Sequence, residues 1–448
     1  MNTIFRIHRA ARPALPISLS VIVPLAMALA MPWTNAAAAT RTITTCADGG
    51  FGSLRDAIQR LAVSGDTIDM SGLACSRIVL TRGQIQIPQN DLTLVGPGRF
   101  GLTIDGAGAT QILWHDGTGT LRIRGLSIAN GFFADPAADG ACIHSRGSVE
   151  LERSRVFRCQ AHARYAIEPG ASGGAVYAWI QVSLSRSSVF DSFATNSGGG
   201  IQSPRVVLYR SQVYGNESTD GGGIASGDIT ATYSLIHGNI AGRGGGIAGR
   251  DMTINKSTIS NNVARFGSGG GILAGFSDQR RVIIDSTISG NTADSESAAE
   301  FTGGETLIVN STIVMNHEVR GPTAQPCVGA LEGGPGTLRL ENTIVALTTC
   351  NNGPAYDIGG SPLFPYPVVG SNNLIGSSVM TLPGDSISAD PRIAPLADNG
   401  GPTRTHMLLA DSPAINRGHN NFNREYDQRG PGFPREKGAF PDIGAIER

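Results

Sequence analysis

The sequence predicts an all-β solenoid, and three observations support this fold class. A glycine-led phrase, Gly-Gly-Gly-Ile, recurs at 198–201, 221–224, 244–247 and 269–272, with a variant at 173–176. A second phrase, Ser-x-[Val/Ile]-x-x-Asn, follows each triple-glycine run and occurs once more at 311–316. Apolar residues recur five and three positions before its serine in most repeats and two positions after it. The asparagines lie 23, 23, 29 and 25 residues apart, and a period in the low twenties is typical of solenoids.

Residues 1–39 predict a secretory signal peptide. Three arginines form a positive n-region, an apolar run follows at 15–31, and small residues at 36–39 offer a cleavage site. Beyond this segment, no stretch approaches the ~18 apolar residues that a membrane span needs. We therefore expect a secreted or cell-surface protein with no transmembrane span after the signal is removed.

A short amphipathic helix is expected at Ser53–Leu61, because apolar residues there follow the spacing i, i+3, i+4, i+7. Ser53 and Asp56 stand where a helix cap and its partner acid belong. A helix in front of a β-solenoid covers the open edge of the first coil. We assign residues 40–76 to this N-terminal cap.

Short alternating strands separated by Gly, Asp, Asn and Pro turns are expected over 77–350. Apolar columns that align from repeat to repeat indicate side chains stacked inside a tube. Glycine runs supply the tight corners, and a column of asparagines is expected to form an internal structural ladder of amides rather than a catalytic row. The ladder residues are Asn216, Asn239, Asn262, Asn291 and Asn316.

The composition bears on two properties: the class of binding partner and the oxidation state of the cysteines. The chain has 16% charged residues and a formal net charge of -1, without a basic stripe in its sequence, which argues against nucleic acid. All six cysteines follow the signal peptide, and an even number in an exported chain indicates disulfides. Fifteen pairings are possible, of which we expect nearest neighbours, and zinc remains the alternative. The expected pairs are Cys46–Cys75, Cys142–Cys159 and Cys327–Cys350.

The repeats resemble the right-handed parallel β-helix of the pectin-lyase-like superfamily. The Gly-Gly-[Gly/Ala]-Ile and Ile-x-x-Asn phrases at 173–316 are also similar to those of bacterial polymorphic outer membrane proteins. This resemblance implies a bacterial surface protein. It also makes polysaccharide cleavage the enzymatic alternative, since pectate lyases share the fold.

The periodicity fades after 350, and residues 351–448 form a Pro- and Gly-rich C-terminal region. Its phrases Leu-Ala-Asp-Asn-Gly-Gly-Pro-Thr at 396–403, Ser-Pro-Ala-Ile-Asn at 412–416 and Asp-Ile-Gly-Ala-Ile-Glu at 442–447 closely resemble the choice-of-anchor domain of type Q. That domain closes many predicted surface proteins of bacteria.

Two catalytic motifs match by letter but not by context. The G-x-G-x-x-G at 96–101 is followed by another strand rather than by a helix, which argues against a dinucleotide site. The G-x-S-x-G at 170–174 lies in a glycine corner rather than in a strand-to-helix elbow, which argues against a serine hydrolase.

An enzyme would place its residues where the repeat is interrupted. The first such place follows Cys159 and offers His162, Arg164, Tyr165 and Glu168 as catalytic candidates. The second, Thr292–Gly303, contains three acids, Asp294, Glu296 and Glu300. Solvated loops are the alternative interpretation of both. A groove that collects three or more carboxylates or arginines from neighbouring coils would favour the enzyme, and a plain Ser/Thr/Asn face the scaffold.

The leading interpretation is a secreted or cell-surface β-helix scaffold, non-catalytic, for adhesion or for envelope or carbohydrate interaction. The alternative is a polysaccharide lyase or glycoside hydrolase acting on an acidic polysaccharide. The expected partner is a polysaccharide or another cell-surface component. No cofactor and no metal is expected for the scaffold, and Ca²⁺ only for the lyase.

Overall fold

The structure is a computed structural model, and it describes residues 38–135, 138–163, 170–275, 280–319, 327–351, 353–360 and 365–448. The signal-peptide segment lies almost entirely outside these residues. Residues 38–448 form one compact unit. Among the described residues, no helix is long and apolar enough to cross a membrane.

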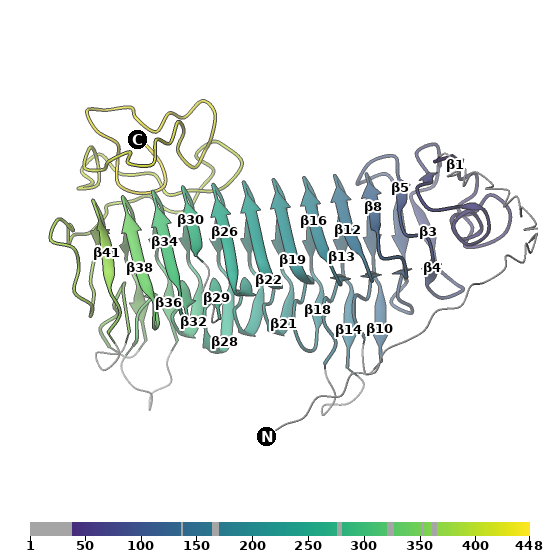
Figure 1. The fold of residues 1–448 in the computed structure, drawn as a ribbon, viewed down its shortest axis with the longest axis horizontal. Coiled ribbons are helices and arrows are strands. Elements are labelled where there is room, and N and C mark those ends of the chain that lie inside the picture. The colour runs from purple at the N-terminus through teal and green to yellow at the C-terminus, as the bar shows by residue number, and fades with distance from the viewer. Residues whose placement is uncertain are drawn as a thin grey trace, which may run out of the picture. The chain divides into compact units, whose positions relative to one another are not determined.

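Three parallel sheets wind around one apolar interior, which confirms a parallel β-solenoid (Figure 1). Sheet A contains β1 Thr40–Thr42, β2 Thr67–Asp69, β4 Ile85–Ile87, β5 Leu92–Val95, β7 Leu113–His115, β8 Thr120–Arg124, β11 Ile143–Ser145, β12 Ser148–Glu152, β15 Val176–Ala178, β16 Gln181–Ser185, β19 Ile201–Tyr209, β22 Ile224–Thr232, β25 Ile247–Gly249, β26 Asp251–Asn255, β29 Ile272–Ala274, β30 Arg281–Ile284, β33 Ala299–Phe301, β34 Glu305–Val309, β37 Leu331–Glu332, β38 Thr337–Glu341 and β41 Val368–Ser371.

Sheets B and C contribute one strand each to a coil. Sheet B contains β3 Arg77–Val79, β6 Thr103–Asp105, β9 Ser127–Ala129, β13 Arg155–Phe157, β17 Ser188–Phe190, β20 Gln212–Tyr214, β23 Leu235–His237, β27 Thr258–Ser260, β31 Thr287–Ser289, β35 Thr312–Val314, β39 Ile344–Ala346 and β42 Leu374–Ile375. Sheet C contains β10 Phe132–Ala134, β14 Gln160–His162, β18 Phe193–Ala194, β21 Glu217–Asp220, β24 Ile240–Arg243, β28 Val263–Ser268, β32 Thr292–Ser295, β36 His317–Glu318 and β40 Thr349–Cys350.

Two polar ladders run through the buried interior along the stacking axis. The amide of Asn216 donates to the Oδ1 of Asn239 at 3.0 Å, and the same bond joins Asn239 to Asn262. The serine that opens each second phrase forms the other ladder: the backbone N–H of Ser211 donates to the Oγ of Ser234 at 3.2 Å. These bonds provide partners for backbone groups that are buried at the bends. The repeat therefore specifies internal hydrogen bonds as well as an apolar core.

Glycine is required at the first two positions of each run for two different reasons. The first glycine has a positive φ, for example 61° at Gly198 and 63° at Gly221, which a residue with a Cβ adopts only at a cost. The second glycine has no space for a side chain, because a Cβ on Gly199 would lie 2.4 Å from the carbonyl oxygen of Glu217. Each corner therefore requires a sharp turn and close contact between coils.

The N-terminal helix is present, and its second half is wider than expected. It consists of α1 Leu54–Asp56 and a π-helical turn, η1 Ala57–Leu61, which packs against β4. Ser53 caps it by accepting a hydrogen bond from the N–H of Asp56 at 3.2 Å. Leu61, the last apolar residue in the helical spacing, is 46% exposed. A π turn closes from i to i+5, which rotates Leu61 away from the buried face.

Three disulfides pair Cys46 with Cys75, Cys142 with Cys159 and Cys327 with Cys350. Such bonds persist in oxidising compartments, so they fit an extracellular protein.

The C-terminal region (yellow in Figure 1) folds back along the downstream coils, where it contacts sheet B. Gln428 accepts a hydrogen bond from Thr287 of β31 at 2.6 Å, and His406 is bonded to Ser289 at 2.8 Å. A small apolar cluster, containing Val314, Ile344, Leu408 and Ile443 among others, lies between the region and the sheet. The outer face of sheet B is therefore covered downstream of β23.

Candidate functional site

From β12 onward, each coil passes from sheet A to sheet B through one residue with a positive φ, which in most repeats directly precedes the serine of the second phrase. We call this column the A/B corner. Its members from Arg153 onward are Arg153, Arg186, Arg210, Tyr233, Lys256, Asp285, Asn310, Asn342 and Asn372, with φ between 45° and 55°. This conformation costs a residue with a Cβ roughly 1–2 kcal/mol. None of these residues is glycine, so each of these strained turns carries a side chain.

The first three side chains of the A/B corner are exposed arginines on consecutive coils: Arg153, Arg186 and Arg210. Coils repeat at about 4.8 Å, and two like charges that close repel by about 1 kcal/mol in water. Among the described residues, none of the three forms a salt bridge. We call them the arginine row.

Many charges that face each other across coils are of opposite sign, although Asp228 also faces Asp251 and Glu300 faces Glu332. The observed pairs are Arg122–Glu150 at 3.1 Å, Arg124–Glu152 at 3.2 Å, Arg205–Asp228 at 3.4 Å, Arg243–Asp220 at 2.9 Å and Arg280–Glu305 at 3.4 Å. Such pairing is what stacked strands favour. The arginine row has no such partner among the described residues, and an external anion would compensate its charge.

A wide, open pocket of about 710 Å³ lies against the upstream part of the row. Arg153 and Arg186 line it together with Arg99 and Arg124, while the glycine-rich turn at 95–98 forms one wall. The only carboxylate in its lining is Glu152, which is paired with Arg124. Four arginines and one glutamate give the lining a formal charge of +3. This contrasts with the chain's net charge of -1.

A second hollow of about 290 Å³ shares Arg124 and Glu152 with this pocket and continues over sheet A. Tyr209 lines it, and the guanidinium of Arg210 lies 5.7 Å from the centre of the Tyr209 ring. The two hollows therefore adjoin at Arg124 and Glu152 and form one surface with charged residues and an aromatic edge. Its positive charge and open shape suit an extended polyanion better than a small enclosed ligand.

A stack of four rings on sheet B stabilises the neighbouring face. Phe157, Phe190, Tyr214 and His237 lie on successive coils, with ring centres 4.7–5.0 Å apart and planes within 5° of parallel. Each inner ring thus has both faces against its neighbours and presents only an edge to solvent. This geometry indicates a structural stack, because a sugar packs on an aromatic face.

The catalytic candidates after Cys159 do not form a described site. His162 lies between Phe132 and Phe193, at 5.5 and 5.0 Å between ring centres, and its Nε2 is 3.3 Å from the Oε1 of Gln160. The other three candidates, Arg164, Tyr165 and Glu168, lie outside the described residues. Their role remains a prediction.

The acids at 292–303 occupy three different environments. Asp294 is exposed and Glu300 half-buried, whereas Glu296 is buried with a φ of 44°, in the register position where earlier coils have the first glycine. Burial, together with a hydrogen bond to Glu332, raises the pKa of the Glu296 carboxyl well above its ordinary value. A hydrogen-bonded acid pair is too close for glycoside hydrolysis, which needs carboxyl groups at least about 5 Å apart.

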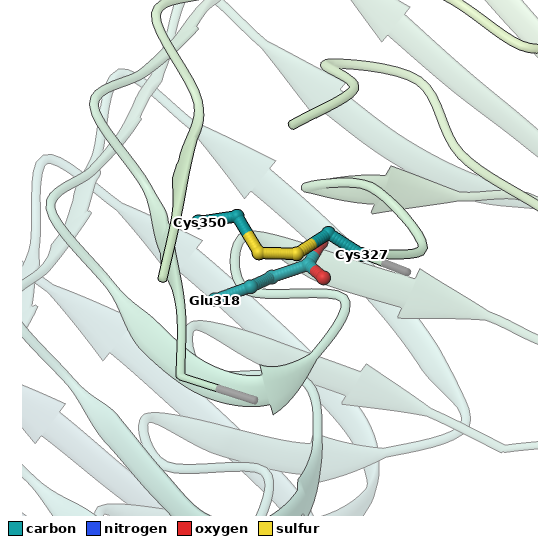
Figure 2. A group of neighbouring side chains, drawn as sticks. All are labelled: Glu318, Cys327 and Cys350. Carbon is teal, nitrogen blue, oxygen red and sulfur yellow. A yellow bond between two sulfur atoms is a disulfide. The ribbon is translucent and has the colours of Figure 1, made fainter. Parts of the chain in front are cut away.

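Glu318, Cys327 and Cys350 lie together at the downstream end of sheet C (Figure 2). The two sulfurs are joined in a disulfide, so neither offers a thiolate to a metal ion. The Glu318 carboxylate accepts hydrogen bonds from the backbone N–H groups of Val328 and Gly329 at 3.0 and 2.6 Å. The arrangement anchors the segment that begins at Cys327 rather than forming a metal centre.

The sequence does not by itself indicate the arginine row, although it contains a signal for it. Three successive repeats read Arg-Ser where the second phrase begins, at 153–154, 186–187 and 210–211. Sequence spacing alone does not identify the position before the serine as a corner where the side chain is exposed. Without that geometry, three arginines more than 20 residues apart do not suggest a row.

Comparisons with known proteins identify no family. No family model matches the chain, and no curated protein matches it. Among solved structures, the crystal structure of pectate lyase Pel9A aligns with a TM-score of 0.47 at 14% identity, covering 92% of this chain and 98% of that chain. A likeness at this level does not transfer an activity. The resemblance to surface anchor domains stays a prediction.

Proposed function

We propose that this protein is an extracellular β-solenoid that binds an acidic polysaccharide at the A/B corner, without cleaving it. The observation that carries the proposal is the arginine row, three uncompensated cations at one corner of consecutive coils. A polysaccharide lying along the stacking axis would present its carboxylates or sulfates one after another. Guanidinium groups pair with such oxyanions through two parallel hydrogen bonds.

A binding role fits the pocket better than catalysis does. Lyase chemistry needs a general base beside the sugar, and hydrolysis needs two free carboxyl groups. The described lining holds no histidine or lysine, and its one carboxylate is paired with Arg124. The lyase remains the second candidate, because a groove with three arginines from neighbouring coils is the feature that favours an enzyme.

The test compares two variants that remove the same charge. In R153Q/R186Q/R210Q the arginine row is neutralised, whereas R205Q/R243Q/R280Q removes three arginines that are already paired with carboxylates. Calorimetric titration with polygalacturonate and alginate should show a loss of at least about tenfold in affinity for the first variant only. Wild-type affinity should fall with rising salt, and dextran should not bind.

Two results would overturn the proposal. One is equal loss of affinity in both variants, which would mean that net charge rather than the row binds the ligand. The other is release of unsaturated sugars, followed by ultraviolet absorbance with and without Ca²⁺, which would establish the lyase. Single-stranded DNA serves as a control polyanion, and tighter binding to it than to either polysaccharide would also contradict the assignment.

A further inference from the structure

A separate pocket of about 260 Å³ lies on sheet A near the start of β19, the strand whose other end precedes Arg210. Tyr177, Trp179, Gln202 and Pro204 contribute to its lining. Gln202 and Tyr209 stand near opposite ends of β19, so at about 3.3 Å per residue the pocket is roughly 20 Å from the arginine row. It is therefore distinct from the proposed polysaccharide surface.

The pocket forms where a column of rings ends. Trp114 stacks on His144 at 4.0 Å between ring centres, and His144 stacks on Tyr177 at 5.3 Å. The next positions in the register are Gln202 and then Ala225, so the column changes from rings to a methyl group. This loss of side-chain volume hollows the surface beside Tyr177.

Trp179 supplies an apolar wall that the fold leaves unburied. Its side chain is 55% exposed, and the guanidinium of Arg146 lies 5.7 Å from the ring centre. Trp179 and Tyr177 thus place two aromatic side chains beside one hollow. Tryptophan next to a concave surface favours an apolar or sugar ligand, because the indole offers a large flat area at small entropic cost.

Gln202 supplies the polar group, and its orientation is fixed by neighbours. Its Oε1 accepts a hydrogen bond from Ser197 at 3.0 Å, and Ser197 is in turn bonded to Ser172 at 3.1 Å. The N–H of Ser172 donates to the carboxylate of Asp139 at 2.9 Å. Since this network uses the amide oxygen, the Nε2 remains as a donor, with no partner among the described residues.

We propose that this pocket binds one uncharged pyranose ring of a neutral oligosaccharide. The apolar face of the sugar packs on the indole of Trp179, and one hydroxyl accepts a hydrogen bond from the Nε2 of Gln202. The lining contains no Asp, Glu, Lys, Arg or His, which favours an uncharged ligand. Arg146, which lies against the Trp179 ring, is outside this lining and is paired with Asp116 at 3.9 Å. The volume suits a single ring, since pockets for larger ligands run from about 300 Å³ upward. This assignment does not depend on the proposed polyanion surface.

The experiment uses the whole oxidised protein and four neutral probes: cellohexaose, xylohexaose, mannohexaose and maltohexaose. At least one should bind in a calorimetric titration and shift the tryptophan emission. W179A and Q202A should each weaken that binding by about tenfold. F266A is the matched control, because Phe266 is an exposed ring on sheet C and is absent from the pocket. F266A should bind like wild type.

The proposal is overturned if none of the four probes binds, or if W179A and Q202A bind as well as wild type does. Equal loss in F266A would also contradict it, since that would indicate nonspecific adhesion to exposed rings. Titration of W179A with polygalacturonate separates this site from the arginine row. Retained polygalacturonate binding in W179A is expected, and its loss would show that the two surfaces are one site.

Discussion

The A/B corner runs from Arg153 to Asn372, and its upstream and downstream halves differ. Upstream, the arginine row faces solvent with three like charges. Downstream, Lys256 and Asp285 pair at 2.9 Å beneath the C-terminal region, and Asn310 donates to the same Asp285 at 3.0 Å. The backbone conformation is the same in both halves, so the difference lies in the side chains and in what covers them.

The covered half shows how this corner is stabilised when no external ligand is involved. The ammonium of Lys256 also donates to the carbonyl oxygens of Tyr426 and Asp427, and Arg424 approaches Asp285 at 2.8 Å. The carboxylate of Asp285 thus lies between two cations, and the buried donors of Lys256 are all hydrogen-bonded to oxygen acceptors. The open half lacks every one of these features. The comparison teaches that the arginine row is not imposed by the fold, which supports its assignment to ligand binding.

The largest expected effect is on the covered half. Asp285→Asn would leave Lys256 and Arg424 without their shared carboxylate in a buried site. Breaking such a network typically costs about 3–5 kcal/mol, because the remaining charges lose their compensation. Unfolding by guanidinium, followed by circular dichroism, should show a loss of this size. Limited proteolysis should release the C-terminal region first.

The matched control for Asp285→Asn is Asp228→Asn. Asp228 pairs with Arg205 at 3.4 Å, but both side chains are about half exposed. Exposed pairs contribute about 0–1 kcal/mol, so this variant should unfold almost as wild type does. Equal destabilisation by the two substitutions would mean that the covered half is no more dependent on its charges than the surface is.

A second prediction concerns pH and the docking of the C-terminal region. Burial raises the pKa of the Glu447 carboxyl to about 8, against an opposing effect of Arg435. The ordinary pKa of this group is 4.5. Between pH 4.5 and about pH 8, the folded protein therefore keeps the Glu447 proton, whereas the unfolded chain has lost it. Stability should therefore fall as pH rises from about 4.5 to 8, by up to about 1.4 kcal/mol per unit.

Hydrogen exchange of residues 427–447 at pH 5 and pH 8.5 would measure this effect, with rates corrected for the intrinsic pH dependence. Glu447→Gln keeps an acceptor for the N–H of Asp442, so it should flatten the pH response without abolishing the fold. An unchanged pH response in Glu447→Gln would show that another group is responsible. The arginine row should bind polygalacturonate equally at both pH values.

The sequence predicts the solenoid and its capping helix because both depend on local periodicity. A repeat encodes inward apolar columns, and Ser53 stands directly before its helix. The docking of the C-terminal region could not be predicted in this way. Lys256 meets Asp427 across 171 residues, and no periodicity links two such positions. Outward columns such as the A/B corner become visible only when the turn geometry is known.

Glu296 illustrates a further limit. Its sequence context suggests a solvated loop, and the neighbouring Asp294 is indeed exposed. The coil register instead places Glu296 at a glycine position, where its carboxyl is buried against Glu332. Sequence spacing alone gives no information on this, because the interval between Asn291 and Asn316 resembles the others. Burial of an acid depends on the neighbouring coil rather than on its own segment.

A small gain in stability is expected from a substitution that makes the open half resemble the covered half. Arg186→Glu would place a carboxylate between Arg153 and Arg210 and replace two repulsive contacts with two attractive ones. Exposed charges at this spacing contribute only modestly, so stability should rise by about 0.5–1 kcal/mol. Affinity for polygalacturonate should fall by at least about tenfold, because the alternating column no longer needs an external anion. Thermal unfolding and calorimetric titration on the same sample test both parts. A variant that gains stability while keeping its affinity would separate the row's charge from its function, and the ligand would then have to bind through Arg99 and Arg124 instead.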